Sequence, residues 1–172
     1  SASSAASDVY KRQIKLMAKV LIKKLDPAVE LPAYKTEGAS GMDLMALVKE
    51  PINLKPNSSC LVPTGLAVAF SSDFEIQIRP RSGLAAKNSI SVLNTPGTID
   101  SDYRGEIKVI LFNHGKSDFL INNKDRIAQM ILTPVIKMDL EETDDLPETI
   151  RGEGGFGSCL LYTSPSPRDN TL

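Results

Sequence analysis

The residues most able to do chemistry in this chain are carboxylates in a short turn. Residues 94–106 read Asn-Thr-Pro-Gly-Thr-Ile-Asp-Ser-Asp-Tyr-Arg-Gly-Glu. Proline and glycine bracket this segment, which predicts a tight hairpin that carries Asp100, Asp102 and Tyr103. A positioned carboxylate can orient a water molecule and remove its proton. By charge alone Asp100 and Asp102 are both candidates for that role, and Asp102 also fits a solvated turn residue.

A glycine-rich segment near the C-terminus has the chemistry of a phosphate site. Residues 151–158 read Arg-Gly-Glu-Gly-Gly-Phe-Gly-Ser. Glycines let the backbone approach a ligand closely and leave N–H groups free for phosphate oxygens. Arg151 adds a fork of donors suited to a phosphate, and Phe156 adds a ring suited to stacking on a base. The alternative interpretation is a flexible glycine-rich tail, because short glycine motifs are weak signals.

A second anion site is indicated in the middle of the chain. Residues 74–79 alternate apolar and polar side chains like a half-buried strand, and residues 80–87 continue with Pro-Arg-Ser-Gly-Leu-Ala-Ala-Lys. A strand that runs into a short helix presents N–H donors, the Ser82 hydroxyl and cations at one spot. The alternative is an ordinary capped helix start. Two more polar blocks, residues 38–44 and 125–130, bring the number to five.

The elements that must position these blocks are short strands divided by Pro, Gly, Asn and Ser, which indicates an all-β chain. Residues 55–58 and 122–125 read as turns, and Gly83–Lys87 is the best candidate for a helix. No stretch of helical period is long enough for alternating strand–helix units, which argues against a parallel-sheet nucleotide fold. A jelly roll or barrel fits this pattern. The expected strands are Lys19–Leu25, Met42–Leu47, Ser59–Pro63, Leu66–Phe70, Phe74–Arg79, Ile90–Leu93, Glu106–Phe112, Phe119–Ile121 and Arg126–Val135.

Composition limits the classes of function. The chain has 172 residues, which suits one domain with one modest core. Its formal net charge of -1 argues against nonspecific nucleic-acid binding, which needs a basic face. No apolar run is long enough to span a membrane. The single histidine, His114, reads as a turn residue, so we expect neither Ser-His-Asp catalysis nor a histidine-rich metal site.

The two ends of the chain look foreign to the segment between them. Residues 3–13 can be encoded by DNA whose reverse complement encodes residues 159–164. Such an inverted repeat resembles translated sequencing-library adapter of the transposase type. We therefore interpret residues 1–13 and 159–172 as an artefact, expect them to be disordered and exclude them from the fold.

The segment between those ends is expected to form a β-domain over residues 14–150, followed by a glycine-rich arm over residues 151–158. It keeps one cysteine, Cys60, in an apolar strand, which reads as a small buried hydrophobe. No disulfide or thiolate metal site is expected within one such chain. With no signal-peptide pattern, the expected compartment is the cytoplasm.

The five polar blocks, in this order, resemble the five motifs of the trimeric deoxyuridine triphosphatases (dUTPases), and the resemblance covers residues 19–158. It implies a small, mostly antiparallel jelly-roll-type β-barrel with one short helix. It further implies a homotrimer in which each active site draws on all three chains. The implied reaction is hydrolysis of dUTP to dUMP and pyrophosphate, which supplies dUMP and keeps uracil out of DNA. The implied cofactor is Mg²⁺.

The resemblance also assigns roles to individual residues. It places the general base at Asp100, which would direct water at the α-phosphorus, and it places Tyr103 under the deoxyribose, where a 2′-hydroxyl would not fit. Magnesium would bind through phosphate oxygens and waters, with no direct protein ligand and with Asp43 acting through water or as a support of the site. Arg126 is a candidate partner for a carboxylate inside the assembly. The implied substrate-binding residues are Arg81, Ser82, Gly83, Asn94, Gly97, Thr98, Ile99, Tyr103, Gln129, Arg151, Phe156, Gly157 and Ser158.

Two other functions remain open at this point. A dCTP deaminase would act on a related fold, but it needs a slot that reads an exocyclic amine, and the hairpin and the glycine-rich segment disfavour it. A catalytically idle nucleotide-binding module is disfavoured by the presence of Asp100. The expected partners are the substrate and further copies of the chain. Binding to nucleic acid or to a membrane is not expected.

Overall fold

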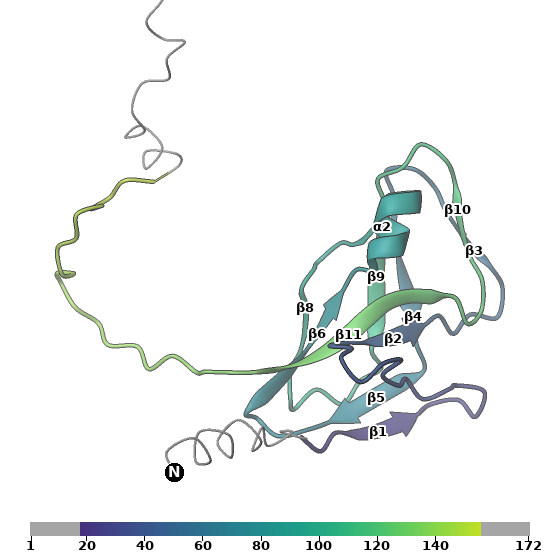
Figure 1. Ribbon diagram of the computed structural model, residues 1–172, viewed down its shortest axis with the longest axis horizontal. Coiled ribbons are helices and arrows are strands. Elements are labelled where there is room, and N and C mark those ends of the chain that lie inside the picture. The colour runs from purple at the N-terminus through teal and green to yellow at the C-terminus, as the bar shows by residue number, and fades with distance from the viewer. Residues whose placement is uncertain (1–17, 156–172) are drawn as a thin grey trace, which may run out of the picture. The chain divides into compact units, whose positions relative to one another are not determined.

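The computed structural model describes residues 18–155, and the expectations for residues 1–13, 156–158 and 159–172 lie outside that range. Within it the chain is all-β apart from one short helix, as the sequence predicts (Figure 1). No helix among the described residues is long and apolar enough to cross a membrane. The elements are β1 (Leu21–Lys24), β2 (Met42–Met45), β3 (Ile52–Leu54), β4 (Ser59–Pro63), β5 (Leu66–Ala69), β6 (Phe74–Arg79), α2 (Ser82–Asn88), β7 (Ile90–Val92), β8 (Gly97–Ile99), β9 (Lys108–Asn113), β10 (Phe119–Ile121) and β11 (Arg126–Pro134).

The strands form four antiparallel sheets. The largest has the order β2-β11-β6-β8, so its two inner strands come from distant parts of the sequence. A second sheet has the order β4-β9-β7. Two further pairs, β1 with β5 and β3 with β10, lie side by side at separate places in the molecule (Figure 1). Every pairing is antiparallel, in agreement with the expected fold class.

The strands of the expected jelly-roll-type barrel do not join into one closed ladder in the described residues. Strands β4 and β5 show why, because only Thr64 and Gly65 separate them, yet β4 joins the β9 sheet and β5 pairs with β1. Gly65 has a φ of +68°, which an L side chain rarely adopts. This sharp turn sends the chain from one sheet to another and divides the strands into packed sheets.

Alternation along the strands builds a single core. In β9, Val109 and Leu111 are buried whereas Lys108 is exposed, which is the two-residue period of a strand with one face inward. The same core receives buried side chains from most of the other strands. Its largest fully buried side chains are Leu44, Leu54, Ile90, Ile107, Leu111, Ile121, Ile127, Val62, Val92, Val109 and Asn113.

The nine expected strands are all present, with ends shifted by a few residues, and the expected helix extends by one residue at each end. Strands β3 and β8 were not expected. Both have three residues, and β8 lies inside the segment interpreted as a hairpin turn, so its sequence shows turn signals rather than alternation. Pairing with β6 makes β8 a strand: Ile76, Gln77 and Ile78 lie opposite its residues.

The chain divides into a compact unit that ends at Ile136 and a second unit that begins at Lys137. In the second unit, residues 137–153 are exposed and contain no regular strand or helix. The acidic run from Asp139 to Glu148 belongs to this exposed stretch, as expected of a solvated linker.

Candidate active site

An ion-pair cluster around Asp43 brings three of the polar blocks together. The Arg81 Nε donates to Asp43 Oδ1 at 2.8 Å, and the Arg126 Nη1 donates to Asp43 Oδ2 at 3.3 Å. The Arg81 Nη1 also donates to the Arg126 carbonyl oxygen at 3.2 Å. Two guanidinium groups on one carboxylate leave a net positive charge, which suits an anionic ligand. The expected pairing of Arg126 with a carboxylate therefore occurs within the chain.

Strand register places Gln129 beside this cluster. Gln129 in β11 lies opposite Asp43 in β2 on one side and Arg79 in β6 on the other. Its Nε2 donates to the Pro80 carbonyl oxygen at 3.0 Å. A Cβ added at Gly41 would lie 2.7 Å from the Gln129 Oε1, so a larger residue there would require the Gln129 side chain to shift. Asp43, Arg81, Arg126, Gln129 and Gly41 are called the Asp43 cluster below.

Ser82 and Gly83 open helix α2 next to the Asp43 cluster, and both are exposed. The N-cap residue is Arg81, which makes no side-chain cap bond, so Ser82 does not serve as an ordinary cap. A Cβ at Gly83 would meet nothing within 4 Å, so packing within this chain does not require a glycine there. Lys87 lies in the last turn of the same helix and is exposed.

The hairpin block forms a separate and more open site. A pocket of about 350 Å³ is lined by residues of β4, β8, β9 and the segment between β8 and β9. Four of the proposed site residues take part: Thr98, Ile99, Asp100 and Tyr103. We call this site the hairpin pocket, and its lining residues are Leu61, Thr98, Ile99, Asp100, Tyr103, Glu106 and Lys108.

Hydrogen bonds to backbone carbonyl oxygens fix the position of Tyr103 in the hairpin pocket. The Tyr103 hydroxyl donates to the Glu106 carbonyl oxygen at 3.1 Å, and the Tyr103 backbone N–H donates to the Asp100 carbonyl oxygen at 3.1 Å. A Cβ added at Gly105 would run into the Tyr103 ring, so this glycine lets the ring lie against the backbone. At the start of β8, the Asn94 side chain lies against Gly97, where an added Cβ would meet the Asn94 Nδ2 at 3.1 Å.

The structure distinguishes between Asp100 and Asp102, the two carboxylates that the sequence leaves as alternatives for the general base. Asp100 lines the hairpin pocket and is exposed, whereas Asp102 is exposed but does not line it. Glu106 also lines the pocket, but its Oε1 accepts the Gly65 backbone N–H at 2.9 Å, which gives this carboxylate a structural task. Among the three, Asp100 is therefore the best placed to receive a water molecule.

Within one chain, Asp100 and the Asp43 cluster lie at opposite ends of a sheet. Strands β6 and β8 are antiparallel, so the Arg79 end of β6 lies near Gly97, and Asp100 follows the far end of β8. Asp43 lies in the row of Arg79, three strands away from β8. With strands about 4.8 Å apart and about 3.3 Å per residue, the two aspartates are roughly 20 Å apart.

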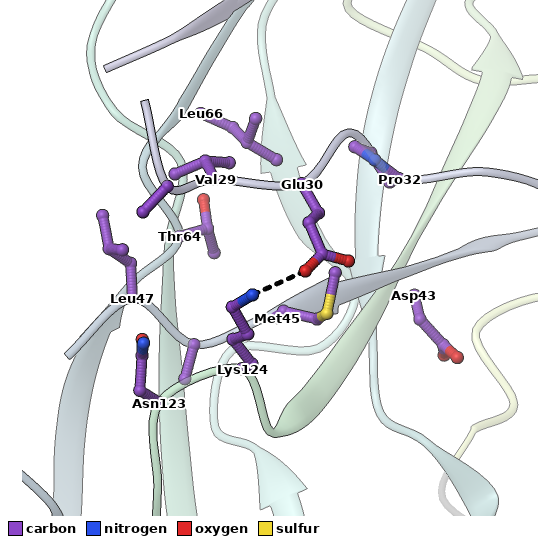
Figure 2. A pocket seen from close by; sticks show the side chains of 12 residues that line it. Val29, Glu30, Pro32, Asp43, Met45, Leu47, Thr64, Leu66, Asn123 and Lys124 are labelled. Carbon is purple, nitrogen blue, oxygen red and sulfur yellow. Dashed lines mark hydrogen bonds and ion pairs between the residues drawn. The ribbon is translucent and has the colours of Figure 1, made fainter. Parts of the chain in front are cut away.

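A smaller cavity next to Asp43 is not suited to a nucleotide (Figure 2). Its volume is about 20 Å³, enough for about one water molecule. The Lys124 Nζ and Glu30 Oε1 pair at 2.6 Å beside it, and the Lys124 ammonium lowers the pKa of the Glu30 carboxyl. Figure 2 shows the Asp43 carboxylate pointing away from this pair. The ion pair between Lys124 and Glu30 joins the two loops that carry these residues.

The glycine-rich arm is described as far as Gly155, and it folds back on itself. The Arg151 Nε donates to the Gly154 carbonyl oxygen at 2.6 Å, and Gly152 has a φ of +52°. Arg151 itself is exposed. Phe156, Gly157 and Ser158, which belong to the same proposed site, lie outside the described residues.

The carboxylates of the described residues do not form a dedicated metal cage. No group of three or more His, Cys, Asp or Glu side chains among residues 18–155 is arranged to hold a metal ion. Both oxygens of Asp43 already accept hydrogen bonds from arginines. Magnesium keeps most of its waters in proteins, and the role expected for Asp43, through water or as a support of the site, stays a prediction.

Sequence reasoning missed three residues of the hairpin pocket, Leu61, Glu106 and Lys108. Glu106 ends the hairpin block, whereas Leu61 and Lys108 lie outside the polar blocks. The latter two come from β4 and β9, where Leu61 lies opposite Ile110 and Lys108 lies opposite Pro63. Only the register between these strands brings them beside Asp100. Their exposure is a property of the folded strands and is not a signal that the sequence offers.

Solved structures share this fold. A dUTPase mutant of Staphylococcus bacteriophage 80alpha, solved with dUpNHpp, superposes with a TM-score of 0.74 at 20% identity, covering 82% of this chain and 98% of that one. A mutant dUTPase from phage phi11 of S. aureus, reported with a structural Mg(II) ion, has a TM-score of 0.68 at 17% identity, covering 76% and 99%. At these identities the likeness concerns the fold alone.

Sequence comparison is more specific. The dUTPase family model matches residues 28–160. A deoxyuridine 5'-triphosphate nucleotidohydrolase of Rickettsia bellii is 53% identical over 147 residues, which is 85% of this chain and 98% of that protein. The enzyme of the same name from Maricaulis maris is 54% identical over 143 residues, 81% of this chain and 94% of that one. With most of its length matched and more than half of the aligned residues identical, the chain belongs to the dUTPase family.

Proposed function

We propose that this protein hydrolyses dUTP to dUMP and pyrophosphate, as the names of its bacterial relatives state for those enzymes. The observation that carries the proposal is the hairpin pocket. Its lining includes the exposed Asp100 carboxylate and the Tyr103 ring, whose hydroxyl donates a hydrogen bond to the Glu106 carbonyl oxygen. Phosphoanhydride hydrolysis needs an activated water, a clamp on the phosphates and a means to read the nucleoside. The chain supplies residues for each need. A cytoplasmic setting remains a prediction.

Asp100 is the proposed general base. It accepts a proton from a water molecule, and the water oxygen attacks the α-phosphorus while the bond to the bridging oxygen of the β-phosphate breaks. Pyrophosphate leaves, and dUMP carries the new oxygen. Asp100 is exposed, so a water molecule can reach its carboxylate.

The hairpin supplies the proposed nucleoside recognition. The Asn94 amide has both a donor and an acceptor for a uracil edge, and the backbone of Gly97, Thr98 and Ile99 supplies the remaining hydrogen bonds. A wrong base would leave these polar groups unpaired, which is an effective means of discrimination. The Tyr103 ring, held by its hydroxyl on the Glu106 carbonyl oxygen, would exclude a ribose 2′-hydroxyl.

The Asp43 cluster supplies the proposed phosphate clamp, with Arg81, Gln129 and the Ser82–Gly83 backbone as donors. A triphosphate is far shorter than the separation between Asp43 and Asp100 within one chain, so a single chain cannot place both on one substrate. We therefore assign the clamp and the base of each site to different copies of the chain, in a homotrimer with closed symmetry. Three copies would then form three such sites.

Bound magnesium would neutralise charge on the triphosphate and favour departure of pyrophosphate. The residues of this chain orient the substrate around it. Arg81 and Gln129 hold phosphate oxygens, and Asp43 accepts hydrogen bonds from waters once the substrate is in place.

The arm from Arg151 to Ser158 is the proposed lid. Its glycines let the backbone close on the substrate, Arg151 reaches a phosphate, and Phe156 stacks on the base.

Deleting the chain from Arg151 onward should lower kcat/KM by more than about tenfold, because base stacking alone is worth about 1–3 kcal/mol. The chain as written should also be less active than one whose foreign tail after Ser158 is replaced by small polar residues. Equal activity of the arm-deleted chain would contradict the lid.

One assay separates the proposed activity from the alternatives. The protein is incubated with dUTP, dCTP, dTTP and UTP, and pyrophosphate and ammonia are measured separately. We expect pyrophosphate from dUTP alone. Ammonia from dCTP would indicate a deaminase, and tight nucleotide binding without either product would indicate an idle binding module.

A further inference from the structure

Glu106 makes two separate contacts at the edge of the hairpin pocket, one through its side chain and one through its backbone. Its carboxylate Oε1 accepts the Gly65 backbone N–H at 2.9 Å, and its carbonyl oxygen accepts the Tyr103 hydroxyl at 3.1 Å. Gly65 lies in the turn between β4 and β5, where the chain passes from one sheet to another. Glu106 therefore connects this turn to the tyrosine of the proposed active site.

The turn at Gly65 is a well-packed support for this connection. A Cβ added at Gly65 would lie 2.5 Å from the Val29 Cγ2 and 2.6 Å from the Leu47 Cδ2, so neighbouring side chains enclose the turn closely. The Gly65 carbonyl oxygen accepts the Leu25 backbone N–H at 2.8 Å. With Leu25 on its carbonyl and Glu106 on its N–H, both backbone polar groups of Gly65 have partners.

The residue after Glu106 is fixed independently of the Glu106 side chain. The buried Thr64 hydroxyl donates to the Ile107 carbonyl oxygen at 2.6 Å, and the Ile107 backbone N–H donates to the Leu66 carbonyl oxygen at 2.8 Å. The Ile107 side chain is fully buried in the core. By contrast, the backbone N–H groups of Gly105 and Glu106 have no backbone partner among the described residues. The position of these two residues therefore depends on the Glu106 carboxylate.

The Tyr103 ring lies against this less supported stretch of backbone. A Cβ added at Gly105 would collide with the ring, so ring and backbone are in direct contact there. The Tyr103 hydroxyl adds one hydrogen bond, to the carbonyl oxygen of Glu106. Any shift of Gly105 and Glu106 would therefore move the surface that holds the ring, even if the hydroxyl kept its bond.

Of the two partners of the Glu106 carboxylate, Gly65 is the more important. The Lys108 Nζ lies 3.7 Å from the Glu106 Oε2, and the Lys108 side chain is 45% exposed. An ion pair with such an exposed partner contributes little to stability. The Glu106 side chain is only 22% exposed, and a hydrogen bond from an N–H group to a carboxylate is among the stronger ones. The bond to Gly65 thus holds the Glu106 side chain in place.

We propose that Glu106 is a positioning residue for sugar discrimination. Its carboxylate, bound to the Gly65 N–H, fixes the backbone on which Tyr103 lies and so keeps the ring where a ribose 2′-hydroxyl would clash. The inference rests on the proposed hydrolysis of dUTP and adds a residue that sets the preference for deoxyribose. Glu106 acts through Tyr103, by the reach of its side chain rather than by its charge.

Two substitutions separate the reach of the side chain from its charge. Glu106→Gln keeps an acceptor oxygen at the same distance from the backbone and removes the charge. Glu106→Asp keeps the charge but is shorter by a methylene group, so its carboxylate falls short of the Gly65 N–H. Glu106→Ala removes both. The measured quantity is the ratio of kcat/KM for dUTP to kcat/KM for UTP, because a loss of folded protein lowers both values together.

We expect Glu106→Ala and Glu106→Asp each to lower this ratio by about tenfold, as for the loss of one hydrogen bond to a charged group. Glu106→Gln should restore most of the ratio. An unchanged ratio in a folded Glu106→Asp variant would overturn the inference, and so would a Glu106→Gln variant as poor as Glu106→Asp. This pair decides the matter even if Glu106→Ala does not fold.

Asp118→Ala is the control for loss of a carboxylate contact elsewhere in the fold. The Asp118 Oδ2 accepts a hydrogen bond from the Asn53 Nδ2 at 2.7 Å, beside the β3–β10 pair, and neither residue lines the hairpin pocket. The ratio for dUTP and UTP should stay unchanged in this variant even where the melting temperature falls. A ratio that falls as far as in Glu106→Asp would show that it follows stability alone, which would overturn the inference.

Hydrogen exchange of the Gly65 amide, followed by NMR, tests the bond without any substrate. Exchange at Gly65 should become about tenfold faster in Glu106→Asp and stay close to the unchanged rate in Glu106→Gln. The Ile107 amide is the internal reference, because its partner is the Leu66 carbonyl oxygen. Unchanged exchange at Gly65 in Glu106→Asp would show that the carboxylate does not hold this turn.

Failure of this inference can be told apart from failure of the proposed function. If the unchanged protein releases no pyrophosphate from dUTP, the proposed hydrolysis is wrong, and the dissociation constants for dUMP and UMP test Glu106 instead. Their ratio should favour dUMP in the unchanged protein and fall in Glu106→Asp. If the unchanged protein hydrolyses dUTP but Glu106→Asp keeps its preference over UTP, the function stands and the role of Glu106 is removed. Equal binding of dUMP and UMP by the unchanged protein would also remove that role.

Discussion

The Asp43 cluster and the hairpin pocket are built in opposite ways. The Asp43 cluster lies where β2, β11 and β6 run side by side, and two arginines and a glutamine contact one another or the backbone directly. The hairpin pocket lies beyond the edge strand β8, is open, and leaves the Asp100 carboxylate exposed.

Because of this difference, mutations in the Asp43 cluster and mutations in the hairpin pocket should have different effects on stability and activity. Changes in the Asp43 cluster should disturb packing and ion pairs as well as phosphate binding, because the same atoms serve both. Changes at Asp100 should affect chemistry with little effect on folding, because no described hydrogen bond of the Asp100 carboxylate supports the fold.

The largest effect is expected at Asp100. Asp100→Asn keeps the shape of the side chain but cannot accept the proton of the attacking water, so kcat should fall by about 10²–10⁴. The dissociation constant for a non-hydrolysable dUTP analogue and the melting temperature should stay close to those of the unchanged protein. Equal turnover would remove Asp100 from the mechanism, and a matched Asp102→Asn variant should retain most of the activity.

The next effect is expected at Arg81. Arg81→Ala removes a charged donor from the phosphates and from Asp43, and kcat/KM for dUTP should fall by about 10- to 100-fold. Arg81→Lys should recover only part of the loss, since an ammonium lacks the two-pronged geometry. Arg79→Ala is the control, because the Arg79 guanidinium bonds to Gln77 rather than to Asp43. An Arg81→Ala enzyme with unchanged kcat/KM would place the clamp elsewhere.

A smaller effect, and one on stability, is expected at Gly41. In Gly41→Ala the new methyl group would come within 2.7 Å of the Gln129 Oε1 and 3.0 Å of the Ile131 Cγ1. Overpacking of this kind should lower the free energy of unfolding by about 1–3 kcal/mol. Gly38→Ala should change it by less than about 0.5 kcal/mol, because nothing lies within 4 Å of that position. Urea unfolding measures both, and equal values would show that Gln129 moves aside freely.

The smallest effect is expected from Tyr103→Phe. This change removes the hydrogen bond to the Glu106 carbonyl oxygen and keeps the ring, so kcat/KM for dUTP should fall by less than about tenfold. Preference for dUTP over UTP should persist, because the ring rather than the hydroxyl excludes the 2′-hydroxyl. Loss of that preference would show that the hydroxyl itself is needed to hold the ring.

Sequence patterns predict the elements of this fold well where side chains alternate. Strands β4, β6 and β10 have the expected ends because their alternation is bounded by turn residues. Strand β8 was not predicted, since Gly97, Thr98 and Ile99 become a strand only through pairing with β6. The hairpin was nevertheless recognised as the place of chemistry, because its carboxylates and turn residues are adjacent in the sequence.

The sequence by itself determined the kinds of groups available, namely the candidate base, the arginines and the glycine-rich arm, because motif residues are close together along the chain. Tertiary structure alone decided which of them meet. It joined Asp43, Arg81 and Gln129 across paired strands, and it put Asp100 at the far end of the same sheet. The physical reason is strand register, which depends on which face is buried and which strands pair, and neither can be read from one segment alone.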